Sequence, residues 1–303
     1  MTKINRKWLD HMEQSEKIND WLFRYQYVYR VRRTEKQKRR FLSALVADLA
    51  EMREDVRVIE YNQGKKYSSN NVYVGNIKKA DRIICTYYDT PPKHFGSYPF
   101  FDRKQQSKHT TNFIMATSAI TLLIGLLATL IYMKVSPTSF QLTSPSTIAA
   151  IICFGLYFFG LSRVAKGLSE RHTLVRNTSS LLAIMEMISR KHDQKTAFAF
   201  VDEGTFGENG IEAMKRSCKA SAKIYVLDSI GSDDPLYFSG TGISKDKLNQ
   251  AKIQQTEPKS ELNYFFSGKE SLDKKGDFFL DQAALKQKQS SQTNCEAIIE
   301  VLQ

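Results

Sequence analysis

Histidine and cysteine, the side chains that most often bind zinc or carry redox chemistry, are scarce in this sequence. Its 303 residues include five histidines, none of them in the C-terminal third, and four cysteines. The cysteines are scattered and form no CxxC pair; they are Cys85, Cys153, Cys218 and Cys295. The sequence therefore excludes a zinc ribbon and a CxxC redox motif, and it predicts structural thiols.

Motifs for two further kinds of chemistry are also missing. Ser179 and Ser180 lie close to His172 in the sequence, but no GxSxG elbow surrounds them and no third member of a triad is evident. Residues 204–210, GTFGENG, contain three glycines without the lysine of a P-loop or the spacing of a Rossmann motif. Serine-hydrolase chemistry and phosphate binding by this glycine-rich segment are therefore not supported.

The N-terminus lacks an apolar segment, but two such segments occur inside the chain. Residues 1–17 are charged, so no signal peptide is expected there. Residues 113–133 carry no charged side chain and, at about 1.5 Å per residue, can cross the hydrocarbon core of a membrane. A second, shorter apolar run covers residues 146–161, and it reaches the length of a span (about 146–165) if Ser162 and the side chains of Arg163 and Lys166 sit at the interface. The alternative is a buried hairpin in a soluble core, and the polar segment at residues 135–147 argues against it.

Basic residues flank the two apolar segments on one side only. Three precede the first segment and three follow the second, whereas the intervening segment has only Lys134 at its edge; the six are Arg103, Lys104, Lys108, Arg163, Lys166 and Arg171. The positive-inside rule places both flanks in the cytoplasm. We therefore expect a multi-pass protein of the cell membrane with cytoplasmic N- and C-termini. Residues 112–166 would form a transmembrane hairpin, and residues 1–111 and 167–303 one cytoplasmic domain.

Positive charge is in excess, with 44 Lys and Arg against 32 Asp and Glu and a net charge of +12. It is concentrated beside the apolar segments and in residues 24–40. Membrane lipids with anionic headgroups are a sufficient partner for this charge. Tyr25, Tyr27 and Tyr29 interleave with arginines, which is compatible with base stacking but more typical of an interfacial amphipathic segment. Because no nucleic-acid motif accompanies them, no nucleic-acid partner is expected.

Hydrophobic periodicity predicts an α/β fold. Strands are expected at residues 56–61, 71–74, 82–88, 196–201 and 223–228, and helices at residues 34–53, 174–190, 211–218 and 244–255. Residues 297–302 fit either a helix or a strand. The alternation predicts a mostly parallel central sheet with helices on both faces, interrupted by the two-helix transmembrane hairpin.

Four segments of this frame, within residues 34–240, resemble the zinc-dependent exopeptidases of the aminopeptidase Y and glutamate carboxypeptidase class. The likeness is greatest to a bacterial branch with membrane spans inserted into the peptidase domain. The segments are similar to two strands ending in HYDT, a helix opening with DNTSG, a strand with an EE turn, and a strand ending in an aspartate ligand. In this sequence they read NNVYV and IICTYYDT (residues 70–74 and 83–90), LVRNTSSLLAIMEM (174–187), FAFVDEGTFGENGIEAM (198–214) and VLDSIG (226–231).

The resemblance implies a site with two zinc ions, a bridging carboxylate and a glutamate that activates water, but most of these residues are replaced. Tyr87 stands where the family has its first histidine ligand. Arg176 stands where the bridging aspartate opens the DNTSG segment, and a guanidinium there opposes binding of two dications. Gly204 and Thr205 stand at the two glutamates when the neighbouring glycines are kept in register. A shifted register would place Asp202 and Glu203 there instead.

Two carboxylates remain at their expected places. Asp228 matches a metal ligand, and Asp89 matches the aspartate that orients the first histidine. One carboxylate alone does not hold zinc with useful affinity. We therefore expect both aspartates to cap the ends of their strands, or one of them to form an ion pair with Arg176.

The leading hypothesis is a membrane-anchored pseudopeptidase without a cofactor, which binds a peptide or membrane-protein partner or serves a membrane complex as an accessory subunit. Its cleft would be lined by Tyr87, Asp89, Arg176, Asp202, Glu203 and Asp228, with Arg176 recognising a carboxylate. The alternative is an active membrane-bound metallo-aminopeptidase with a rearranged zinc site of Asp89, Glu203 and Asp228, joined by Asp202 and His94. A third hypothesis is a structural scaffold with an empty cleft.

Overall fold

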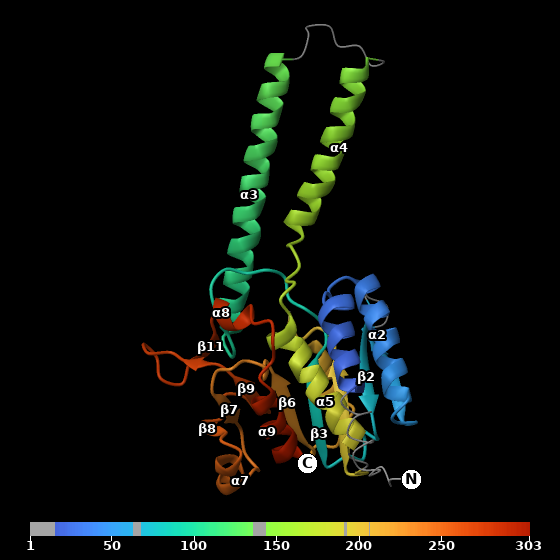
Figure 1. The fold of residues 1–303 in the computed structure, drawn as a ribbon, viewed down its shortest axis with the longest axis vertical. Helices are drawn as coiled ribbons and strands as arrows, with labels where there is room; N and C mark the ends of the chain where they lie inside the picture. The colour runs from blue at the N-terminus through green and yellow to red at the C-terminus, as the bar shows by residue number, and fades with distance from the viewer. Residues whose placement is uncertain (1–15, 63–67, 136–143, 191–192, 206) are drawn as a thin grey trace, which may run out of the picture. The chain divides into compact units, whose positions relative to one another are not determined.

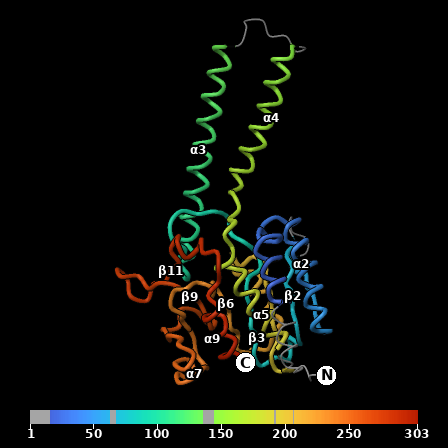
Figure 2. The backbone as a smooth tube through the Cα atoms, in the orientation of Figure 1, coloured from blue at the N-terminus to red at the C-terminus, as the bar shows by residue number. Residues whose placement is uncertain are grey.

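The chain divides into two compact units (Figures 1 and 2). The computed structural model describes residues 16–62, 68–135, 144–190, 193–205 and 207–303. An α/β unit comprises Met1–Pro91, Ser97–Phe101 and Glu170–Gln303, and a hairpin unit comprises Pro92–Gly96 and Asp102–Ser169. The expectations for residues 1–15 and for the polar segment at 136–143 concern parts of the chain outside the described residues.

A sheet of eight strands forms the centre of the α/β unit. Its order is β1-β2-β5-β3-β6-β9-β7-β8. The four central strands, β5, β3, β6 and β9, are parallel, whereas β1, β2 and β7 pair antiparallel with their neighbours and β8 runs parallel to β7. The bounds are β1 Val56–Tyr61, β2 Ser69–Val74, β3 Arg82–Tyr87, β5 Thr196–Val201, β6 Lys223–Asp228, β7 Leu236–Ser239, β8 Gln254–Thr256 and β9 Asn263–Ser267. The predicted α/β class with a mostly parallel centre is confirmed.

Both faces of the sheet are covered, because alternate residues of the six inner strands, β2, β5, β3, β6, β9 and β7, enter two separate apolar clusters. Val72 and Phe198 belong to the cluster under α2 (Glu35–Ala50), α5 (Ser179–Arg190), α7 (Lys245–Gln250) and α9 (Gln292–Leu302). Tyr73 and Ala199 belong to the other cluster. That cluster lies under α6 (Asn209–Lys215), α8 (Gln282–Leu285) and a small sheet of β4 (Tyr98–Pro99), β10 (Lys269–Glu270) and β11 (Phe278–Leu280). Helices on both faces are thus confirmed.

Local hydrogen bonds set where several helices begin and end. Thr34 and Gln37 form a reciprocal capping box at the start of α2. The helix predicted for residues 174–190 consists of a five-residue π-helical turn, η2 (Leu174–Thr178), followed by α5. The helix predicted for residues 244–255 is wrong at its end. Lys252 has a φ of +57°, which ends the helical path, and residues 254–256 pair with β7 as a strand. A second π-helical turn, η1 (Arg24–Val28), was not predicted.

The hairpin unit contains two helices that are long and apolar enough to cross a membrane. They are α3 (Arg103–Val135) and α4 (Pro145–Ala165), and most large apolar side chains of both are exposed. The Tyr157 hydroxyl of α4 donates a hydrogen bond to the Thr121 carbonyl of α3 at 3.1 Å. Gly125 lies beneath the same tyrosine ring, and a Cβ atom there would be 2.2 Å from the Tyr157 hydroxyl oxygen. A residue without a side chain therefore allows this interhelical contact.

Gly125→Leu should separate the two helices, because its side chain would displace Tyr157 and break the hydrogen bond to Thr121. Overpacking of this kind costs about 1–3 kcal/mol. The rings of Tyr132 on α3 and Phe154 on α4 have centroids 6.4 Å apart. We therefore expect disulfide cross-linking between Tyr132→Cys and Phe154→Cys, in a Cys153→Ser background, to slow several-fold. Gly155→Leu is the matched control because nothing lies within 4 Å of its Cβ position. Equal effects of the two leucines would show that the contact is unimportant.

Candidate functional site

The carboxyl ends of three neighbouring parallel strands bring most of the predicted residues to one edge of the sheet. Tyr87 ends β3 and Asp89 follows it, Asp202 follows β5, and Asp228 ends β6. Because β5, β3 and β6 are adjacent and parallel, these residues share the edge where open α/β sheets commonly bind ligands. The three aspartates are almost fully buried, with 1%, 1% and 5% of their surface exposed. Buried carboxylates require hydrogen bonds or opposite charges, and the structure supplies both.

Asp89 holds the loop that follows β5. One of its carboxylate oxygens accepts the Gly204 N–H at 2.9 Å, and the other accepts the Thr205 N–H at 3.1 Å and the Thr205 hydroxyl. The predicted capping of loop amides is therefore observed for Asp89. Asp89 therefore fixes the positions of Gly204 and Thr205.

Asp228 is held by hydroxyl groups instead. It accepts hydrogen bonds from the Tyr98 hydroxyl at 3.0 Å and from the Ser229 hydroxyl at 2.7 Å. The Tyr98 ring also lies under the Arg176 guanidinium, whose central carbon is 3.8 Å from the ring centroid. Tyr98 comes from β4, in a segment to which sequence reasoning gave no role. It joins Arg176 and Asp228 indirectly.

The expected ion pair of Arg176 is not formed. In the described parts of the chain, neither Asp89 nor Asp228 nor any other carboxylate lies within ion-pair distance of its guanidinium. Arg176 is nevertheless 92% buried, with 8% of its surface exposed. The guanidinium stacks on the face of the Tyr98 ring, and in the described residues this aromatic contact takes the place of an ion pair.

The Tyr87 ring fills the space that a side chain at position 204 would need. A Cβ atom on Gly204 would lie 1.7 Å from Cδ1 of Tyr87, so the tyrosine ring rests directly on the glycine backbone. Tyr87 is buried, with 5% of its surface exposed. Tyr87, which the sequence aligns with a histidine ligand, therefore leaves no room for a side chain at position 204.

Asp202 and Glu203 are engaged separately from Asp89 and Asp228. The Asp202 carboxylate forms an ion pair with Lys38 at 2.5 Å and accepts a hydrogen bond from the Glu203 N–H at 2.8 Å. Burial and the nearby charge of Asp89 raise the pKa of Asp202 above its usual value, against the opposing effect of Lys38. The Glu203 carboxylate accepts hydrogen bonds from Ser69 and, at 2.7 Å, from the Asn209 amide.

The alternative metal site is not assembled by these contacts. Across the described ranges, no three His, Cys, Asp or Glu side chains form a group that could hold a metal ion. Glu203 is directed toward Ser69 on β2 and Asn209 on α6, and His94 belongs to the hairpin unit. The donors proposed for the alternative, Asp89, Glu203 and Asp228, therefore each have protein partners of their own.

Sequence reasoning missed Arg32, which is fully buried next to this edge. Its guanidinium donates hydrogen bonds to the carbonyls of Tyr88 at 2.6 Å and Tyr29 at 3.2 Å and lies 4.8 Å from the Phe41 ring centroid. Burial lowers the pKa of Arg32 to about 10, and the negative charge of Asp89 opposes this shift. In the sequence Arg32 is one of many cations in residues 24–40, and no pattern distinguishes it.

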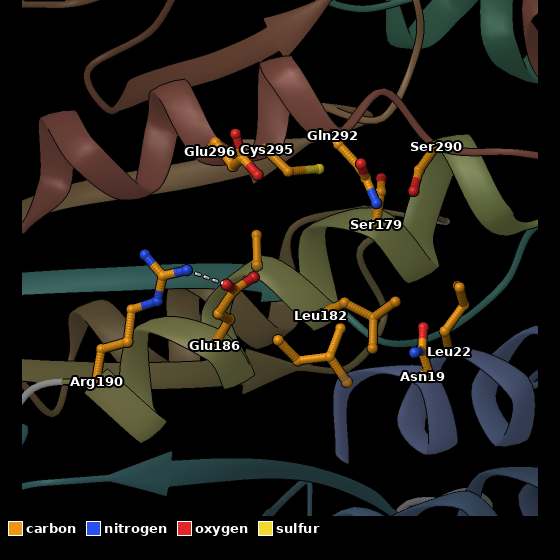
Figure 3. A pocket seen from close by; sticks show the side chains of 12 residues that line it. Asn19, Leu22, Ser179, Leu182, Glu186, Arg190, Ser290, Gln292, Cys295 and Glu296 are labelled. Atoms are coloured by element: carbon orange, nitrogen blue, oxygen red, sulfur yellow. Dashed lines mark hydrogen bonds and ion pairs between the residues drawn. The ribbon is translucent and has the colours of Figure 1, made fainter. Parts of the chain in front are cut away.

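A separate cavity of about 550 Å³ lies between the helical segment at residues 16–23, α5 and α9 (Figure 3). Leu22 and Leu182 contribute apolar surface, and Glu186 forms an ion pair with Arg190 on α5. Burial raises the pKa of the Cys295 thiol to about 12, so this cysteine stays protonated. None of the predicted site residues lines this cavity.

Comparisons with known proteins give structural likeness only. No protein-family model and no curated protein matches the sequence. The LapA aminopeptidase of Legionella pneumophila is similar at 11% identity and a TM-score of 0.48, over 100% of this chain and 74% of that one. A Zn-dependent exopeptidase from Parabacteroides distasonis is similar at 9% identity and a TM-score of 0.48, over 95% of this chain and 94% of that one. The glutaminyl cyclase of Porphyromonas gingivalis is similar at 11% identity and a TM-score of 0.48, over 93% of this chain and 96% of that one. At this level the likenesses carry no conclusion about activity.

Gly204→Ala should destabilise the protein, because its Cβ would overlap the Tyr87 ring and the ring must move. The expected loss is about 1–3 kcal/mol in urea unfolding of the detergent-purified chain. Gly207→Ala is the control, since the nearest atom lies 4.0 Å from its Cβ position, and it should change stability little. The double variant with Tyr87→Ser should lose less than the sum of the two single losses, by roughly 0.5–3 kcal/mol. Additive losses would contradict the shared space.

Proposed function

We propose that this protein is a membrane-anchored, peptidase-like protein that binds an anionic group without hydrolysing peptides. One observation supports the proposal: at the carboxyl edge of the sheet, the residues that the sequence aligns with the metal and base positions of the resembled peptidases are packed against other residues of the chain. The Tyr87 ring rests on Gly204, and the Arg176 guanidinium lies over Tyr98.

The contacts of the remaining carboxylates support a non-hydrolytic site. Asp89 is used to hold the backbone of Gly204 and Thr205, and Asp228 accepts from Tyr98 and Ser229. Activation of water would need a carboxylate or imidazole close to the reacting centre. Gly204, at the position of the family's general base, has neither the side chain nor the space for one.

The membrane anchor is supported by the length and composition of α3 and α4 together with the basic residues beside them. Arg103, Lys104 and Lys108 lie in the first turns of α3, and Arg163 and Lys166 lie at the end of α4. Under the positive-inside rule these ends face the cytoplasm. The α/β unit would then be cytoplasmic, with the lipid bilayer as a partner.

Arg176 is the residue that we assign to ligand binding. A mostly buried guanidinium is unfavourable unless an anion accompanies it, and no carboxylate pairs with it in the described residues. Its planar donors suit a carboxylate, such as the C-terminus of a peptide or protein partner. The ligand would supply the charge that Asp89 and Asp228 do not.

The hydrolytic alternative is tested by metal content and activity. The detergent-purified full chain, incubated with zinc and then freed of excess metal, should retain far less than one zinc per chain by mass spectrometry. It should also release no product from aminoacyl p-nitroanilides. Arg176→Asp restores a carboxylate at the bridging position and serves as the comparison. Stoichiometric zinc in the wild type together with hydrolysis would overturn the proposal.

Anion recognition is tested with N-acetylated tripeptide pools that carry either a free or an amidated C-terminus. The free-carboxylate pool should bind the full chain more tightly, and Arg176→Gln should weaken that binding about tenfold or more, since a hydrogen bond to a charged group contributes about 1.5–3 kcal/mol. Arg216→Gln removes an exposed arginine of the same unit and should have no effect. Equal binding of the two pools would refute a role of Arg176 in carboxylate recognition while leaving the zinc result unaffected.

A further inference from the structure

A second, smaller cavity in the α/β unit has a different character from the edge of the sheet. Its volume is about 390 Å³, within the range of roughly 300–1,000 Å³ that is usual for small-molecule sites. Three segments far apart in the sequence form it: η1 with the residue two positions after it, the segment that leads into η2, and the segment after α8. Its polar lining includes Gln26, Tyr27, Arg30, Arg171, His172 and Lys288.

The lining is strongly positive. Arg30, Arg171 and Lys288 each bring a permanent cation to the cavity, one from each of the three segments. Within the described part of the chain, none of the three forms an ion pair with a carboxylate. Three cations that line one cavity without an ion-pair partner in the described residues favour an anion there, because a bound anion would be attracted by all three.

The nearest acidic residue in the sequence does not supply that anion. The Glu170 carboxylate accepts the N–H groups of Arg171 at 2.7 Å and His172 at 2.9 Å and lies 3.1 Å from the His172 Nδ1 atom. Burial would raise its pKa, but the hydrogen bonds from His172 and Arg171 outweigh burial and hold the pKa below its usual value. Glu170 does not line the cavity. It is used to shape the segment that carries Arg171.

Hydrogen bonds between the walls fix the cavity. The Gln26 side-chain amide donates to the Lys288 carbonyl at 3.1 Å, which ties η1 to the segment after α8. The Thr173 hydroxyl donates to the Arg30 carbonyl at 3.1 Å, which ties the start of η2 to the chain after η1. The backbones that carry the three cations are thus positioned before any ligand arrives, which lowers the entropy cost of binding.

We propose that this cavity binds an anionic phosphate ester through Arg30, Arg171 and Lys288. Guanidinium groups bind phosphate oxygens in a bidentate manner, and a phosphate dianion matches three cations better than a single carboxylate does. This inference goes beyond the proposed function, because it concerns a different cavity and none of the residues assigned to peptide recognition.

Two sources of the phosphate share this chemistry. The headgroup of an anionic phospholipid is one. Under the proposed function α4 lies in the membrane, and Arg171 is only six residues beyond the end of that helix at Ala165. A soluble phosphate ester is the other. The two sources differ in whether acyl chains contribute to affinity, and this difference can be measured.

Isothermal titration of the full chain in a neutral detergent tests the proposal with three probes: dihexanoyl phosphatidic acid, glycerol 3-phosphate and zwitterionic dihexanoyl phosphatidylcholine. The first or the first two should bind, and the third should not. Arg30→Gln, Arg171→Gln and Lys288→Gln should each weaken binding about tenfold, and the triple variant should abolish it. Similar affinity for the first two probes identifies a soluble ester, and binding of phosphatidic acid alone identifies a lipid headgroup.

A charge-matched variant separates a site from general attraction between charges. Lys36→Gln, Lys245→Gln and Lys247→Gln together remove three exposed cations from the same unit, none of them in an ion pair within the described residues. This variant should bind phosphate esters like the wild type. Thermal unfolding of both triple variants checks that they are folded. Undiminished binding in the cavity triple variant, or an equal loss in the control, would overturn the proposal.

Discussion

A fully buried guanidinium is unfavourable unless its charge and its donors are satisfied, and Arg32 imposes this requirement on the carboxyl edge of the sheet. Backbone carbonyls at the end of β3 and after η1 accept its hydrogen bonds, and Asp89 supplies the opposing charge. The same carboxylate accepts the amides of Gly204 and Thr205. The Asp89 carboxylate therefore has two effects: its charge offsets that of Arg32, and its oxygens hold the loop after β5. A ligand that bound the Asp89 carboxylate would have to displace its hydrogen bonds to the loop and weaken its attraction to Arg32.

The elements that were predicted well are those whose own sequence decides their structure. The apolar runs at residues 196–201 and 223–228 became β5 and β6 with the expected bounds, because a continuous buried run fits a central parallel strand. The short aromatic runs of β7 and β9 were not predicted, since four or five apolar residues are compatible with several structures. Residues 254 and 255 were predicted as the end of a helix, and pairing of residues 254–256 with β7 overrode their local preference.

The candidate site divides in the same way. Asp89 was predicted to cap loop amides, and it does so through residues placed by the adjacent strand. The predicted ion pair of Arg176 failed because its actual neighbour, Tyr98, comes from β4, a two-residue strand far from it in sequence. The role of Arg32 was likewise hidden, because burial of one cation among many depends on tertiary packing. The sequence motifs predicted which residues stand at the family's ligand positions, a prediction that stays untested, but they did not predict what those residues contact.

The charges at this edge single out Arg176. The neighbouring carboxylates of Asp89 and Asp202 would repel each other, and the electrostatic attraction of Arg32 and the ion pair with Lys38 offset this repulsion. Asp228 is satisfied by two hydroxyls, and Ser229 beside it is held at a φ of +59°. A non-glycine residue keeps such a conformation only where its surroundings fix it, so this part of the edge does not readily rearrange to pair with Arg176. In the described residues no carboxylate at this edge therefore balances the charge of Arg176, and this is the physical basis on which we propose an external anion as its ligand.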